Sequence, residues 1–254
     1  MKKISLVVKD SKKPLKLAEK IEKYLTSKGI EVCYNAAGDA IIAMGGDGTI
    51  LRAVSLVRNK QIPILGINFG TTGFLTEVNP GEWRAAIDRL LSGNYAIEER
   101  VKLRVEINRK KIGDALNEAV VITSAPVKML HLQVSVDRKS AGIMKADGLI
   151  IATPTGSTAY SFSCGGPMVD ERVNCLIITP ICPFERGAHS LIVPQNSEVE
   201  VKLVKPGKEA VVVMDGEYRK KLSCDDEVSF TTSKNKAYFV KLRKDFYGRV
   251  RERL

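Results

Sequence analysis

The sequence has no long apolar run and no paired cysteines, and each absence excludes a class of protein. No stretch approaches the roughly 20 apolar residues of a membrane-spanning helix, so we expect no membrane partner. The five cysteines are odd in number and include no C-x-x-C pair, which argues against a disulfide framework and a structural zinc site. The apolar run after Met1 is too short for a signal peptide, so we expect a cytoplasmic protein.

Aromatic residues are also scarce, at 6% of the chain, while positive charge is abundant. Lys and Arg number 40 against 29 Asp and Glu, a net charge of +11 that favours polyanionic partners. The lysine pairs are short, scattered and not interleaved with aromatic side chains, unlike a nucleic-acid platform. We therefore expect small anions such as nucleotides or polyphosphate as ligands and no nucleic acid partner.

The length of 254 residues suits two domains, and the hydrophobic pattern changes near residue 95. Before that point, short apolar runs alternate with segments of helical periodicity, which predicts an α/β domain over 1–95 with a mostly parallel sheet. The expected strands are 4–8, 30–34, 41–44 and 62–67, and the expected helices centre on 17–25, 49–58 and 80–91.

Beyond residue 95 the pattern has period two, as in Val101, Leu103, Val105 and Ile107. Half-buried antiparallel strands show this alternation, so we expect a β-sandwich over 96–235. Phe246, Val250 and Leu254 are spaced four apart, which indicates a C-terminal helix within 236–254 that packs back on the first domain.

The segment Gly45-Gly46-Asp47-Gly48-Thr49 stands between an apolar strand and an apolar helix. A strand, a tight turn and a helix N-terminus expose backbone N–H groups that attract phosphate. A carboxylate beside bound phosphates requires a metal ion or a proton to accept, and both tasks belong to phosphoryl transfer. No Lys follows the last glycine, so this is not the common phosphate-binding loop. A second glycine-rich segment, 66–73, ends the next strand, and the two loops could share a site.

Two further segments carry polar groups where apolar ones are expected. Asn117-Glu118 interrupts an apolar run, and burial of such groups costs about 1–3 kcal/mol each unless they find partners. Asp147 precedes a buried strand, and hydroxyl residues crowd the segment from Thr153 to Ser163, where they could contact sugars and bases. A bulge or a strand start at the first segment and a Ser/Thr-rich hairpin loop at the second remain the alternatives.

In this order and spacing the motifs resemble the NAD kinase family, together with Gly165-Gly166-Pro167, Ile181-Cys182-Pro183 and Asp215-Gly216. The resemblance spans almost the whole chain. It implies a Rossmann-like first domain, NAD bound between the domains, and a homodimer or homotetramer. The implied reaction transfers a phosphoryl group from ATP, another NTP or polyphosphate to the 2′-hydroxyl of the adenosine ribose of NAD, with Mg²⁺ or another divalent metal.

The resemblance also implies roles for individual residues. Asp47 would be the general base, and Asn117 and Glu118 would hold the adenosine part of NAD. Arg52, Lys128 and Lys145 are candidate cationic contacts to phosphate. The other expected ligand contacts are Gly45, Gly46, Gly48 and Thr49 for the donor phosphates, and Phe74, Asp147, Thr155, Thr158, Ala159, Tyr160, Ser161, Phe162 and Ser163 for the dinucleotide.

The chain departs from the family pattern at a few positions. His189-Ser190 stands where bacterial relatives have an Arg-Pro pair, and Cys164 and Cys182 replace smaller or different residues. These changes leave donor preference and contacts between subunits open. A lipid kinase of the diacylglycerol or sphingosine type, which shares the Gly-Gly-Asp-Gly-Thr turn, is the alternative enzyme. A dinucleotide sensor without catalysis is the alternative binding protein.

Overall fold

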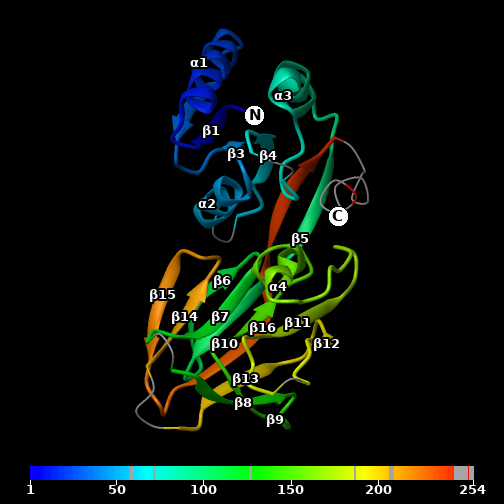
Figure 1. Cartoon of the computed structure of the whole chain (residues 1–254). Helices are drawn as coiled ribbons and strands as arrows, with labels where there is room; N and C mark the ends of the chain where they lie inside the picture. The colour runs from blue at the N-terminus through cyan, green and yellow to red at the C-terminus, as the bar shows by residue number, and fades with distance from the viewer. Residues whose placement is uncertain are drawn as a thin grey trace. The chain divides into compact units, whose positions relative to one another are not determined.

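The chain of the computed structural model divides into two compact units (Figure 1). The first comprises Met1–Arg100 and the chain from Lys236 onward, and the second comprises Val101–Asn235. The structure describes residues 1–57, 60–70, 73–125, 128–185, 187–205, 209–242 and 251. The predicted C-terminal helix, with Phe246, Val250 and Leu254, lies outside the described residues.

The first unit is built on parallel strands in the order β2-β1-β3-β4, and the last residues of β16 pair in parallel with β4. Helix α1 connects β1 with β2 and helix α2 connects β3 with β4, and such crossover connections allow the parallel pairing of these strands. The predicted mostly parallel sheet is therefore confirmed. The elements are β1 (Lys3–Val8), α1 (Lys12–Ser27), β2 (Glu31–Tyr34), β3 (Ala40–Gly45), α2 (Asp47–Val57), β4 (Pro63–Asn68), a 3₁₀ turn (Pro80–Glu82), α3 (Trp83–Ser92), and the end of β16 (Glu227–Lys241).

The two faces of this sheet bury different helices because side chains alternate along each strand. Ile42 and Met44 of β3 share one core cluster with the apolar stripes of α1 and α3. On β4, a Cβ atom at Gly66 would lie 2.9 Å from Cδ1 of Ile50 in α2. Gly66 therefore allows α2 to pack closely, which places the N-terminus of α2 at the carboxyl end of β3.

The second unit is a sandwich of antiparallel strands whose two inner faces share one core. One sheet contains β5, β6, β8, β9, β13 and the first part of β16, and the other has the order β12-β11-β10-β7-β14-β15. The elements are β5 (Ala96–Ile107), β6 (Lys110–Ala115), β7 (Glu118–Thr123), β8 (Leu130–Val136), β9 (Lys139–Ala146), β10 (Gly148–Ala152), a 3₁₀ turn (Thr155–Thr158), α4 (Tyr160–Ser163), β11 (Cys175–Ile181), β12 (Leu191–Pro194), β13 (Val199–Leu203), β14 (Ala210–Met214) and β15 (Tyr218–Leu222).

The central strands of the six-stranded sheet are buried on both faces. Val120, Ile150 and Ile177 form a second cluster with Val169 and Cys175 on the side away from the sandwich core. This explains why β7, β10 and β11 read as continuous apolar runs rather than as alternating ones. The segment after β10 covers this outer face, and it is the hydroxyl-rich segment that the sequence singled out.

Candidate functional site

One candidate site, in the first unit, is the turn between β3 and α2. β3 ends at Gly45 and α2 begins at Asp47, and the amides of Thr49 and Ile50 donate to the Gly46 carbonyl at 2.9 and 3.3 Å. The neighbouring β4 ends beside it, because the Phe69 N–H donates to the Gly45 carbonyl at 2.9 Å. The structure thus brings the 45–49 and 66–70 segments together, as the parallel topology predicted. Thr71 and Thr72 of the second segment lie outside the described residues.

The three glycines of this turn serve different purposes. A Cβ atom at Gly45 would meet the side chain of Thr49, so this glycine is required by packing. At Gly46 and Gly48, by contrast, an added Cβ atom would meet no atom of the described residues within 4 Å. The backbone at these two positions can therefore approach a ligand closely, which suits a phosphate-binding turn.

Asp47 is the carboxylate of the turn, and backbone amides fix its orientation. The Phe74 N–H donates to Oδ2 at 3.2 Å, and the Leu75 N–H donates to Oδ1 at 3.1 Å. A Cβ atom at Gly73 would lie 2.9 Å from Oδ1 of Asp47, so a glycine is needed for this approach. The Phe74 ring was expected to line the dinucleotide site, but the side chain is buried and its backbone contacts Asp47.

Arg52 and Lys9 are the two basic residues with contacts at the start of this turn or at the neighbouring end of β1. Nη2 of Arg52 donates to the carbonyl of Val8 at 2.5 Å, and its buried Nε has no hydrogen-bond partner among the described residues. Arg52 is thus tied to the end of β1, while its role toward phosphate stays a prediction. Lys9 follows β1, and its Cβ lies 3.1 Å from the position that a Cβ would take at Gly45. Sequence reasoning missed Lys9, although it too ends a strand at the carboxyl edge of the sheet.

A second candidate site lies in the second unit, at one end of the six-stranded sheet. Glu118 opens β7 and pairs with Ala152, the last residue of β10. Oγ1 of Thr153 donates to the Leu116 carbonyl at 2.7 Å, and the Thr153 N–H donates to the Asn117 carbonyl at 2.9 Å. The register therefore brings Asn117-Glu118 and the hydroxyl-rich segment together, although 34 residues separate Glu118 from Thr153 in the sequence.

Asn117 and Glu118 are buried, and each carries an oxygen that lacks a partner. Oδ1 of Asn117 and Oε2 of Glu118 accept no hydrogen bond from any residue that the structure describes. Burial is the main reason that the pKa of Glu118 rises to about 8, and the charge of Asp215 raises it further, against a backbone hydrogen bond from Tyr160. Unpartnered acceptors in a buried place are costly, so they mark where a ligand with hydroxyl donors could bind.

Asp215 was not predicted as a site residue, yet its carboxylate holds the 116–118 backbone. Oδ2 accepts the Leu116 N–H at 2.7 Å, and Oδ1 accepts the Asn117 N–H at 2.8 Å. The signal in the sequence was Asp215-Gly216 directly after the apolar run of β14, a turn whose Asp has φ +48°. An acidic residue at such a position could bind backbone amides of a neighbouring strand.

Several of the predicted hydroxyl contacts turn out to support the segment itself. Oγ of Ser161 shares a hydrogen bond of 2.9 Å with Oγ1 of Thr179, and both groups are buried. Oγ1 of Thr158 donates to the Thr155 carbonyl at 3.3 Å. Tyr160, by contrast, is 40% exposed and remains available for stacking on a ligand. Of the other predicted contacts in this segment, Ala159 and Phe162 are partly buried and Ser163 is exposed.

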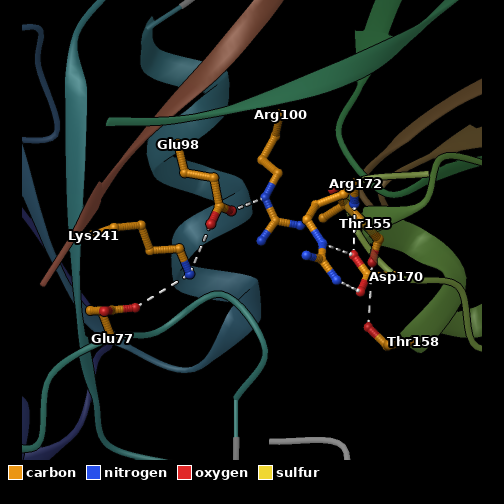
Figure 2. A network of polar contacts seen from close by, with 8 residues as sticks. All are labelled: Glu77, Glu98, Arg100, Thr155, Thr158, Asp170, Arg172 and Lys241. Carbon is orange, nitrogen blue, oxygen red and sulfur yellow. Dashed lines mark hydrogen bonds and ion pairs between the residues drawn. The ribbon is translucent and has the colours of Figure 1, made fainter. Parts of the chain in front are cut away.

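Asp170 and Arg172 lie beside Thr155 and Thr158 in Figure 2. The Arg172 guanidinium donates to both Asp170 oxygens, at 2.9 and 2.7 Å. Val169 is tied to the same segment because its N–H donates to Oγ of Ser157 at 3.0 Å. Sequence reasoning missed this charged pair because neither residue interrupts an apolar pattern.

Asp147, Lys145 and Lys128 take separate positions in the second unit. Asp147 precedes β10 and Thr155 follows it, so the strand of about 17 Å separates their backbones. The pKa of Tyr160 is raised, mainly by burial and then by the nearby Cys164 and Cys182. The negative charge of Asp147 makes a smaller contribution to the same rise. Nζ of Lys145 lies 5.6 Å from the centre of the Phe184 ring, and Lys128 is exposed.

A separate charged cluster occupies the first unit, where β5 and β16 begin and end (Figure 2). Nζ of Lys241 lies 3.4 Å from Glu77 and 3.2 Å from Glu98, and Glu98 also pairs with Arg100. All four side chains are largely buried. They hold strand ends together and are not among the predicted ligand contacts.

Known proteins resemble the chain over both halves. Residues 5–95 match the family model of the ATP-NAD kinase N-terminal domain, and residues 116–242 match that of the ATP-NAD kinase C-terminal domain. An NAD kinase from Methanothermobacter thermautotrophicus is 44% identical over 274 residues, which cover 100% of this chain and 96% of that protein. The lipid kinase alternative is therefore not favoured.

Solved structures agree with these matches. The crystal structure of an NAD kinase from Archaeoglobus fulgidus in complex with ATP has a TM-score of 0.83 and 30% identity, and the match covers 98% of both chains. Yeast NADH kinase complexed with NADH shares the fold, with a TM-score of 0.89 at 22% identity over 98% of this chain and 86% of that chain. The predicted α/β plus β-sandwich class is confirmed, and the chain belongs to the NAD kinase family of enzymes.

Proposed function

We propose that the enzyme transfers the terminal phosphoryl group of ATP, another NTP or inorganic polyphosphate to the 2′-hydroxyl of the adenosine ribose of NAD. Membership of the family supports the kinase activity. The arrangement of Asp47 carries the finer proposal. Two backbone amides orient its carboxylate at the start of α2, between two glycines that leave space for phosphates.

In the proposed reaction Asp47 accepts the proton of the 2′-hydroxyl while the hydroxyl oxygen attacks the terminal phosphorus. The bond between this phosphorus and the bridging oxygen of the donor breaks. The electron pair stays on that oxygen, which leaves with the rest of the donor, ADP in the case of ATP. The backbone N–H groups of Gly46, Gly48 and Thr49 bind the donor phosphates at the N-terminus of α2. With ATP the products are NADP, ADP and a proton.

A divalent metal, preferably Mg²⁺, would bind at this turn only if the phosphates of the donor provide part of its ligands. The residues that the structure describes contain no group of three or more His, Cys, Asp or Glu that could hold a metal ion. Mg²⁺ binds through one or two carboxylates together with substrate phosphates, so Asp47 and the donor would provide its ligands. When bound, the metal neutralises charge on the phosphates, and Asp47 provides orientation and accepts the proton.

The dinucleotide is proposed to satisfy the two unpartnered oxygens of the second unit. Oδ1 of Asn117 accepts hydrogen bonds, the carboxyl of Glu118 donates one when it is protonated and accepts when it is ionised, and the hydroxyls of a ribose can do both. Tyr160 is exposed enough to stack on a base, and Thr155 and Asp147 lie on the chain to either side of β10. The preference for a polar dinucleotide over a lipid follows from these groups.

The Asp47→Asn variant tests the mechanism, and Asp39→Asn is its matched control. Asp39 also accepts two backbone amides, those of Lys2 at 2.5 Å and Lys3 at 3.1 Å, but it precedes β3 whereas Asp47 follows it. NADP is measured with a strictly NADP-dependent dehydrogenase after incubation with NAD, ATP and Mg²⁺. We expect Asp47→Asn to lower kcat by at least about 100-fold and Asp39→Asn to retain activity. Equal NADP production by wild type and Asp47→Asn would contradict the role of Asp47.

Substrate range needs separate experiments. Replacing ATP by polyphosphate tests the donor, replacing NAD by NADH tests the acceptor, and phosphorylation of a diacylglycerol instead of NAD would revive the lipid kinase. The Glu118→Ala variant is expected to raise KM for NAD more than KM for ATP. The reverse order would place Glu118 elsewhere.

Location and assembly also remain proposals. No helix of the described chain is long and apolar enough to cross a membrane. We propose a cytoplasmic enzyme that forms a homodimer or homotetramer. Light scattering of the purified protein measures its mass, and a mass of one chain would contradict the assembly.

A further inference from the structure

The turn after β14 contacts the backbone that carries Asn117 and Glu118. Asp215 follows Met214, which pairs with Ala119, so the register sets Asp215 beside the start of β7. Its Oδ1 accepts the Asn117 N–H at 2.8 Å and lies 3.4 Å from the Glu118 N–H, and its own N–H donates to the Glu118 carbonyl at 3.1 Å.

These contacts go beyond ordinary sheet pairing because a side chain makes them. Oδ2 of Asp215 also accepts the Leu116 N–H at 2.7 Å, so one carboxylate binds consecutive amides at a strand end. Without it these amides would need other partners. Holding this backbone also fixes the directions of the Asn117 and Glu118 side chains. Oδ1 of Asn117 and Oε2 of Glu118 have no hydrogen-bond partner among the described residues.

We propose that Asp215 is a positioning residue for NAD, which orients Asn117 and Glu118 through their backbone amides without touching the substrate. The inference rests on the proposed function, which assigns Asn117 and Glu118 to the dinucleotide. It adds a residue that acts through them. Asp215 also determines which of the two neighbouring carboxyl groups carries the charge.

The groups around the two carboxyls support this division. Burial raises the pKa of Asp215, but three backbone amides and Lys102 on β5 oppose the rise. Glu118 has one opposing contact, from the Tyr160 amide, and faces the Asp215 charge. Burial raises the pKa of the Cys164 thiol, and the neighbouring Glu118 carboxyl adds to this rise. The amides and Lys102 thus favour the charge on Asp215 over the charge on Glu118, whose raised pKa keeps its proton near neutral pH.

Two substitutions separate the charge of Asp215 from its geometry. Asp215→Asn removes the charge and one acceptor, and Asn tolerates the φ of +48° at this position. Asp215→Glu keeps the charge and moves the carboxylate away from the amides. Asp137→Asn is the matched control, because Asp137 has φ +50° and accepts the Glu198 N–H at 2.9 Å and the Ser197 hydroxyl at 3.0 Å elsewhere in the same unit.

Steady-state kinetics and carboxyl NMR give independent readouts. We expect both Asp215 variants to raise KM for NAD by about tenfold, with KM for ATP unchanged and Asp137→Asn like wild type. In protein labelled with ¹³C at glutamate side chains, the Glu118 resonance is identified by its loss in Glu118→Gln. Its titration midpoint, about 8 in wild type, is expected to fall in Asp215→Asn and to stay high in Asp215→Glu.

The outcomes distinguish this inference from the proposed function. If the wild type makes no NADP, the proposed function fails, while the NMR titration still tests the coupling of Asp215 to Glu118. If NADP is made but KM for NAD and the Glu118 midpoint are unchanged in Asp215→Asn, the positioning role is overturned. Loss of the folded state in both Asp215 variants, measured by circular dichroism, would assign Asp215 to stability alone and would also overturn it.

Discussion

A Cβ atom at Gly45 would lie 2.1 Å from Oγ1 of Thr49, closer than any real contact between these atoms. Thr49 is buried in the first turn of α2, so it cannot move aside freely. The Gly45→Ala variant is expected to lose about 1–3 kcal/mol of unfolding free energy, the usual cost of overpacking. Thermal unfolding of the purified variant measures the loss.

The Gly46→Ala variant is the matched comparison, because its Cβ would meet no described atom within 4 Å. We expect it to unfold like wild type but to raise KM for ATP, since the added methyl group occupies space proposed for phosphate. If Gly46→Ala kept wild-type KM for ATP, the donor would not bind at this turn.

A second close approach joins Gly156 to the backbone at Asn117 in the second unit. A Cβ atom at Gly156 would lie 2.1 Å from the Asn117 carbonyl oxygen and 2.5 Å from its carbon. Backbone cannot yield as a flexible side chain does, so Gly156→Ala is expected to lower the unfolding free energy by about 2 kcal/mol or more and to weaken NAD binding. Calorimetric titration with NAD and thermal unfolding measure the two effects.

Gly187→Ala serves as the control for Gly156→Ala, since no described atom lies within 4 Å of the added methyl group. Similar NAD affinity in the two variants would separate Gly156 from the binding site, even if Gly156→Ala were less stable.

In the second unit, apolar runs in the sequence mark the central strands but not the edge strands β9 and β15. β7, β10 and β11 are apolar throughout because both of their faces are buried. β9 and β15, in contrast, lie at sheet edges and are mostly exposed, so no apolar run or regular alternation marked them. The physical cause is that backbone hydrogen bonds form with almost any side chain. A strand whose side chains are exposed therefore has no characteristic pattern of apolar residues.

The site residues divide in the same way. Asp47, Asn117 and Glu118 are polar residues beside apolar runs, which made them visible as candidates. Asp215 stood in a motif of the sequence, but its contact with the 116–118 backbone, like the approach of Lys9 to Gly45, is visible only in the structure. The support role of Ser161 depends on Thr179 of another strand, and no local pattern contains that information.

The buried cluster around Lys241 predicts acid sensitivity of the first unit. Burial tends to raise the pKa of Glu98, but Arg100 and Lys241 together lower it below its usual value. A lowered pKa stabilises the fold above the unfolded value near 4.5, and this contribution is lost as the pH falls through the folded value. Lys241→Met is expected to cost about 3 kcal/mol at neutral pH, because it removes the cation between the largely buried Glu77 and Glu98 carboxylates, and Arg100 offsets this loss only at Glu98.

Lys236→Met is the control for Lys241→Met. Nζ of Lys236 lies 2.5 Å from Glu99, but both side chains are about half exposed, so solvent weakens their attraction. We expect a change below about 1 kcal/mol in urea unfolding at neutral pH. If the two variants lost equal unfolding free energy, the buried ion pairs of Lys241 would be no stronger than the exposed pair of Lys236.

The raised pKa of Glu118 predicts that the protein becomes less stable as the pH rises. The folded protein keeps this proton up to about pH 8, whereas the unfolded chain releases it near 4.5. The folded state therefore binds more protons between these values, and the unfolding free energy falls with pH across this window. The group contributes a loss of about 3 kcal/mol between pH 4.5 and pH 7. Glu118→Gln has no proton to release, so its stability relative to wild type is expected to grow by that amount. Urea unfolding at several pH values, with the exposed Glu19→Gln as control, measures the difference; a constant difference across the window would place an ionised Glu118 in the folded protein.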